Sequence, residues 1–97
     1  MDESTVRQHA EAHGSAVVAG DLRTAGSDLT PEAAAQAPGV MGKLPRPTTA
    51  AEVQKLETVG DEVVVHILYK GNDSDATVVS TWADRDGRPM IVNLEVG

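Results

Sequence analysis

The spacing of apolar residues changes near residue 48, and this change limits the fold more than any other feature of the sequence. Apolar residues recur at helical intervals before this point and alternate with polar residues after it, as they do in half-buried strands. At 97 residues the chain has room for a single domain, 1–97, with helices at about 5–44 and a sheet at about 50–96. We therefore predict an α+β fold with N-terminal helices packed on a four-stranded antiparallel sheet.

The first predicted helix has a recognisable start, end and buried face. A cap at Ser4 or Thr5 begins it, and Gly20 weakens or ends it. One narrow stripe of this helix collects apolar residues and a histidine: Val6, Ala10, His13 and Val17, with His9 at its edge. This stripe is expected to be the buried face of the helix.

A second helix is predicted to begin at Pro31. Thr30 is a suitable cap, proline fits the first helical position, and Glu32 favours the positive end of the helix dipole. Further along, Pro38-Gly39 is expected to kink or break this helix, because proline lacks the backbone N–H that the next helical hydrogen bond needs.

Four strands follow, separated by turn signals, at 51–59, 62–70, 75–83 and 89–96. Gly60-Asp61 fits a two-residue hairpin turn that starts with glycine. The second and third strands carry apolar residues on both faces, so we expect the face without helices to pack against a second copy of the chain. The sequence thus predicts a homodimer formed through the sheet.

Charge and composition argue against several classes of partner. With 8 basic and 15 acidic residues, the net charge of −7 repels nucleic acid and anionic membranes. Aromatic residues make up 2% of the chain, too few for a platform that stacks on bases. No apolar run approaches the ~20 residues of a membrane span, and the acidic N-terminus differs from a signal peptide. We expect a soluble, cytoplasmic protein, and the abundance of Ala, Gly and Val favours a high-GC bacterial source.

Three segments carry a resemblance to a known family: 19–22 (Ala-Gly-Asp-Leu), 29–33 (Leu-Thr-Pro-Glu-Ala) and 81–92, where Trp82 precedes Asp86-Gly87-Arg88 and an apolar strand. They resemble the SnoaL-like, or nuclear transport factor two-like, proteins of the cystatin-like α+β class. The resemblance implies a curved sheet wrapped around helices as a cone open at one end, often dimerising through its outer face. Members include isomerases, polyketide cyclases and dehydratases, but the phenol and paired carboxyls of the isomerases cannot be mapped onto this chain.

His9 and His13 are spaced to let two imidazoles on one helix face reach the same metal ion. The motif is His-Ala-Glu-Ala-His, no third ligand accompanies it, and the chain has no cysteine. The glycines form no phosphate-binding pattern either. We therefore predict neither a metal site nor a cofactor.

His13 has two possible roles in the predicted cone. It is either a buried, hydrogen-bonded neutral imidazole with a structural role, or a general base paired with a carboxylate from the sheet. His66, on a predicted strand, is a weaker candidate base, and its alternative place is the dimer face. No confident catalytic residue follows from the sequence, and the balance is against an enzyme.

A small apolar cleft is expected inside the cone. Tyr69 and Trp82 are the only aromatic residues, and a large ring in such a core is more often a packing anchor than a ligand contact. The residues predicted to line the cleft are His9, His13, Val17, Met41, Tyr69 and Trp82.

Three hypotheses for function remain open. The first is a homodimeric binding or structural protein with at most a small cleft. The second is an isomerase-type or cyclase-type enzyme, or a ligand-binding protein, that uses His13 on a small apolar molecule. The third is a module that binds another protein through the exposed sheet face.

Overall fold

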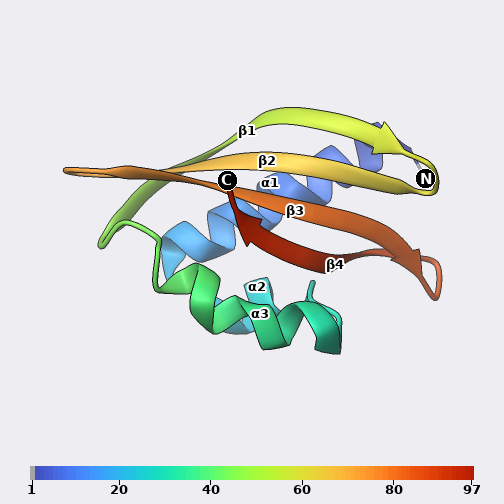
Figure 1. The fold of residues 1–97 in the computed structure, drawn as a ribbon, viewed down its shortest axis with the longest axis horizontal. Helices are drawn as coiled ribbons and strands as arrows, with labels where there is room; N and C mark the ends of the chain where they lie inside the picture. Colours follow the sequence, from blue (N-terminus) through green and yellow to red (C-terminus); the bar gives the residue numbers. More distant parts are fainter. Residues whose placement is uncertain (1) are drawn as a thin grey trace.

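The computed structural model describes residues 2–97. Its elements are α1 (Glu3–Ala19), α2 (Leu22–Gly26), α3 (Pro31–Met41), β1 (Thr48–Val59), β2 (Glu62–Gly71), β3 (Asp75–Arg85) and β4 (Arg88–Val96). The strands form one antiparallel sheet in the order β1-β2-β3-β4, and the helices lie on one side of it (Figure 1). The prediction of an α+β fold with N-terminal helices on a four-stranded antiparallel sheet is confirmed.

Helix α1 begins two residues earlier than the predicted cap allows. Asp2 is the N-cap, and its carboxylate accepts a hydrogen bond from the Ser4 N–H at 3.0 Å. The prediction of a Ser4 or Thr5 cap was wrong, because an aspartate just upstream satisfies a free N–H and also favours the positive end of the helix. The predicted end is confirmed, since Gly20 closes the helix in the left-handed conformation at φ 75°. No helix within residues 2–97 is both long and apolar enough to cross a membrane.

Helix α2 was not predicted as a separate element. Its N-cap is Asp21, whose carboxylate accepts from the Thr24 N–H at 3.2 Å. The helix has five residues, too few for a periodic pattern to be visible in the sequence.

Helix α3 starts as predicted, with the Thr30 hydroxyl accepting from the Ala33 N–H and proline at the first position. The helix continues through Pro38-Gly39 to Met41, so the prediction of a break there was wrong. Pro38 has no N–H to offer the carbonyl of Ala34, but both residues are exposed, and water can satisfy that carbonyl.

The strands match the predicted runs with small extensions, and the turns follow the expected chemistry. Gly60, at φ 60°, opens the β1–β2 hairpin, while Asp86 and Gly87, at φ 57° and 83°, form the β3–β4 turn. In register, Val63 pairs with Trp82 and Trp82 with Ile91, so these three side chains share the inner face of the sheet.

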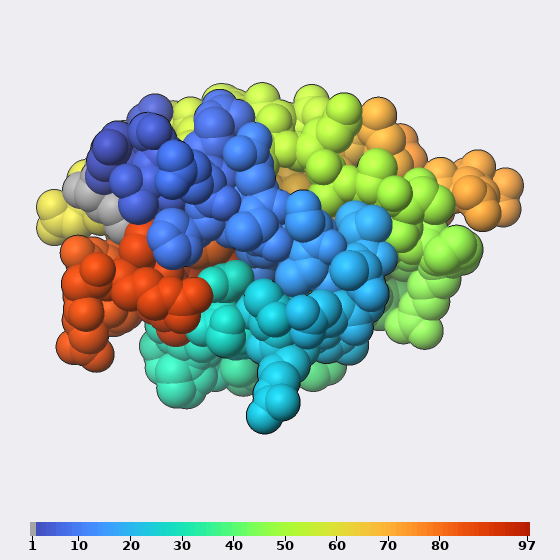
Figure 2. All heavy atoms as spheres, turned by 180° about the vertical axis from the view of Figure 1, so that it is seen from behind, coloured from blue at the N-terminus to red at the C-terminus, as the bar shows by residue number. Residues whose placement is uncertain are grey.

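The core lies between this inner face and the predicted stripe of α1. Val6, Ala10 and Trp82 are fully buried there, and Trp82 is the largest of the fully buried side chains. Helix α1 packs mainly on β1 and β2, and α3 packs on β4. Figure 2 shows the helical side of the molecule, with blue α1 beside β1 and cyan α2 next to the C-terminal half of α1.

The chain between α2 and α3 bonds to the free edge of β4 at Ile91. The Ile91 N–H donates to the Asp28 carbonyl at 2.7 Å, and the Thr30 N–H donates to the Ile91 carbonyl at 3.0 Å. These bonds form a short parallel bridge between Leu29 and Ile91. The bridge protects a sheet edge and also places the Asp28 side chain beneath the helices.

Candidate functional site

An apolar cavity lies between the C-terminal half of α1, helices α2 and α3, and the inner face of the sheet. Its volume is about 170 Å³. The wall residues contributed by the helices and their connections are Val17, Leu22, Ala25, Gly26, Leu29, Ala37, Val40, Met41 and Leu44, and the sheet adds Tyr69, Val78 and Leu94. His13 completes the wall and is the one residue there, Tyr69 apart, with a polar side chain.

Tyr69 brings a hydroxyl group to this apolar wall from the inner face of β2. The residue is 2% exposed, and no described residue forms a hydrogen bond with its hydroxyl. All fully buried polar side-chain atoms of residues 2–97 do have such partners, so the hydroxyl keeps some accessible surface, and the residue itself lines the cavity. Burial raises the pKa of Tyr69 far above its ordinary value, because the phenolate would lose its hydration. The group is therefore a neutral phenol with a free hydrogen-bonding oxygen.

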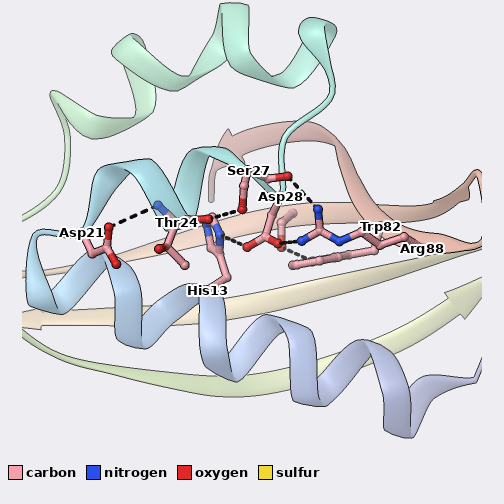
Figure 3. A network of polar contacts seen from close by, with 8 residues as sticks. His13, Asp21, Thr24, Ser27, Asp28, Trp82 and Arg88 are labelled. Carbon is pink, nitrogen blue, oxygen red and sulfur yellow. Dashed lines mark hydrogen bonds and ion pairs between the residues drawn. The ribbon is translucent and has the colours of Figure 1, made fainter.

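His13 is held by a buried carboxylate from the connection between α2 and α3. Its Nδ1 lies 2.9 Å from Oδ2 of Asp28, and both side chains are about 10% exposed or less. The other oxygen of Asp28 accepts a hydrogen bond from Arg88 of β4, which also donates to the Ser27 carbonyl at 2.9 Å (Figure 3). The predicted partner for His13 was a carboxylate from the sheet, and this was wrong, because the edge bridge of residues 28–30 delivers an acid from the helical layer.

Trp82 fixes the orientation of the imidazole from the other side. The two rings pack edge to face with centroids 6.1 Å apart and an interplanar angle of 89°. The indole N–H donates to the Ser80 hydroxyl at 2.9 Å, so the tryptophan is itself anchored in the sheet. A carboxylate and a ring thus contact the His13 imidazole from two sides.

Four of the six residues predicted for the cleft lie on this cavity: His13, Val17, Met41 and Tyr69. His9 and Trp82 do not. Trp82 is fully buried in the core, and His9 packs near it with ring centroids 6.5 Å apart, one helical turn away from the cavity. His66 is half-buried on the opposite face of the sheet, where it has no access to His13.

The sequence did not point to Asp28, Leu22, Leu29 or Leu44 as parts of the site. Asp28 lies fifteen residues after His13 in the chain, and no helical or strand period relates the two. The sequence did contain a signal for Asp28. This carboxylate stands two residues before the Thr30 cap, at the point where the chain enters a helix.

The two histidines of α1 are not arranged as a metal site. His13 uses Nδ1 for Asp28, and His9 turns toward Trp82. Within residues 2–97, no group of three or more His, Cys, Asp or Glu side chains is placed to hold a metal ion.

Comparison with known proteins leaves the family open. No protein-family model matches the chain, and no curated protein matches it as a relative.

Proposed function

We propose that the protein binds a small, largely apolar molecule in the cavity beside His13. The observation that carries this proposal is an apolar cavity of about 170 Å³ whose wall includes an unpaired phenol and an imidazole held in place. An apolar cavity of about 150 Å³ in another protein is large enough for benzene. Pockets for drug-sized ligands begin near about 300 Å³, so the expected ligand has roughly the size of one ring.

The mouth of the cavity favours the same proposal. Leu22 and Met41 line the cavity, yet they are 50% and 37% exposed and are two of the three large apolar residues that the described surface leaves exposed. Exposed apolar side chains at a cavity mouth favour the binding of a ligand with an apolar surface, because binding removes both surfaces from water.

The test is a titration of the protein with benzene or toluene. Binding is monitored in nitrogen–proton correlation NMR spectra of the nitrogen-15-labelled protein. Saturable shifts of amides around Val17, Ala37 and Val40 are expected. Ala37→Leu, which fills the cavity, should lower the affinity at least tenfold, and Ala34→Leu, on the exposed side of the same helix, should leave it unchanged. Shifts that do not saturate, or an equal effect of the two variants, would contradict the proposal.

A second candidate is proton-transfer catalysis, and the contact between His13 and Asp28 favours it. A carboxylate bonded to Nδ1 of a neutral imidazole leaves Nε2 as a base, and Tyr69 offers a neutral donor in the same cavity. The test is exchange of the α-protons of cyclohexanone for deuterium. An exchange rate that exceeds the rate in buffer alone, and that falls to the buffer rate in His13→Ala, would support catalysis. Exchange at the buffer rate with the wild-type protein would leave binding as the function.

We further propose that the chain is a cytoplasmic, SnoaL-like protein of bacterial origin with the cystatin-like cone. Support for the cone comes from the order of helices before a four-stranded meander, from the curved strands over α1 (Figure 1), and from the position of the cavity between the helices and the inner face of the sheet.

Pairing of two copies through the outer sheet face belongs to the same proposal. Val64 and Leu68 of β2 and Val79 of β3 point away from the helices and are only half-buried in the single chain. Such a face gains free energy when a second apolar surface covers it. A different protein could cover it as well, and the oligomeric state discriminates between the two.

A further inference from the structure

The charges next to the cavity cancel one another. Asp28 is the one buried carboxylate within residues 2–97, and the guanidinium of Arg88 bonds to it directly. The residues that line the cavity include no Asp, Glu, Lys or Arg. A ligand in the cavity therefore meets no charge that is left without a partner, and an ionic ligand would lose its hydration without an opposite charge to replace it.

The two polar side chains of the wall offer complementary hydrogen bonds. A carboxylate accepts only, so Nδ1 of His13 carries a proton toward Asp28. In a neutral imidazole with this tautomer Nε2 is an acceptor, and no described residue donates to it. Tyr69 is a neutral phenol whose hydroxyl both donates and accepts.

We propose that the cavity selects an uncharged molecule of one-ring size that carries a hydroxyl group. This inference rests on the proposed function and names the ligand class of the same cavity. A hydroxyl group is the smallest group that both donates to Nε2 and accepts from a phenol. A hydrocarbon of the same shape leaves both wall groups without partners, and a carboxylate brings a charge that nothing in the wall balances.

Three probes of similar size separate the possibilities: phenol, toluene and benzoate. We expect phenol to bind at least about tenfold more tightly than toluene, which is the ratio that one well-placed hydrogen bond contributes. Benzoate should bind more weakly than either at neutral pH. Dissociation constants come from NMR titration of the full chain.

The outcomes distinguish this inference from the proposed function. Equal affinity for phenol and toluene would overturn selection by the hydroxyl group while leaving the cavity as a binding site. Tightest binding of benzoate would also overturn it, because it would show an uncompensated positive charge. Failure of all three probes would overturn the proposed function together with the inference.

Tyr69→Phe removes one oxygen and keeps the ring that lines the cavity. It should reduce the preference for phenol over toluene by at least threefold, through weaker binding of phenol. Equal loss of affinity for both probes would show that the variant alters the cavity itself, and the role of the hydroxyl in selection would be overturned.

Discussion

Asp28 holds a buried negative charge between an imidazole and a guanidinium. Asp28→Asn removes the negative charge that Arg88 pairs with and replaces one of the two acceptor oxygens by a donor. Where this donor faces His13, the imidazole keeps a partner only if its proton moves to Nε2. We expect a loss of about 1–3 kcal/mol in the free energy of unfolding, measured by urea denaturation. Asp21→Asn is the control, because Asp21 is an exposed helix cap and asparagine caps almost as well. Equal stability of the two variants would mean that the buried contact contributes nothing.

Tyr69 makes stability depend on pH in the alkaline range. Burial raises its pKa above the ordinary value, which is about 10. In the unfolded chain this group releases its proton near pH 10, and in the folded chain it does not, so the free energy of unfolding should fall as the pH rises above about 10. Because Tyr69 is the only tyrosine, tyrosinate absorbance reports on it alone. Tyr69→Phe should remove this part of the decline, and tyrosinate in the native protein at pH 10 would contradict the prediction.

Among the elements, α3 is joined to β4 by two hydrogen bonds of one side chain. Gln36 accepts from the Leu94 N–H and donates to the Asn93 side chain, both at 2.8 Å. Gln36→Ala should cost about 1 kcal/mol in urea denaturation, although alanine is the better helix former. Gln8→Ala, at an exposed site of α1, supplies the control for helix propensity and should not destabilise. A similar effect at both sites would rule out a specific role of Gln36.

The existence and order of the elements follow from local sequence, and their exact ends often do not. The Thr30-Pro31 start, the Gly20 stop and the glycine-led turns were predictable because each requires a particular residue. The start of α1 at Glu3 and the passage of α3 through Pro38 were not predictable. The first depends on which of several possible caps is used, and the second on whether water can bond to the carbonyl that Pro38 leaves free.

For the whole molecule, we expect a dimer that is formed through the outer sheet face. Sedimentation at micromolar concentration should show a species of twice the mass of the chain. Val79→Glu places a charge in the middle of this face and should shift the protein to the monomer, while Ala34→Glu, on the exposed side of α3, should not. A wild-type protein that sediments as a monomer would contradict the homodimer and favour another partner or none.

The sequence by itself determined the α+β class, the meander of strands and the buried stripe of α1 that includes His13, because these depend on short-range periodicity and turn chemistry. It also pointed to His13, Val17, Met41 and Tyr69, which line the cavity. Only the tertiary structure decided that Asp28 and Arg88 meet beside His13, and that Trp82 fills the core instead of the cavity. Those contacts join residues fifteen or more positions apart, and they arise from the bridge that residues 28–30 form with the edge of β4.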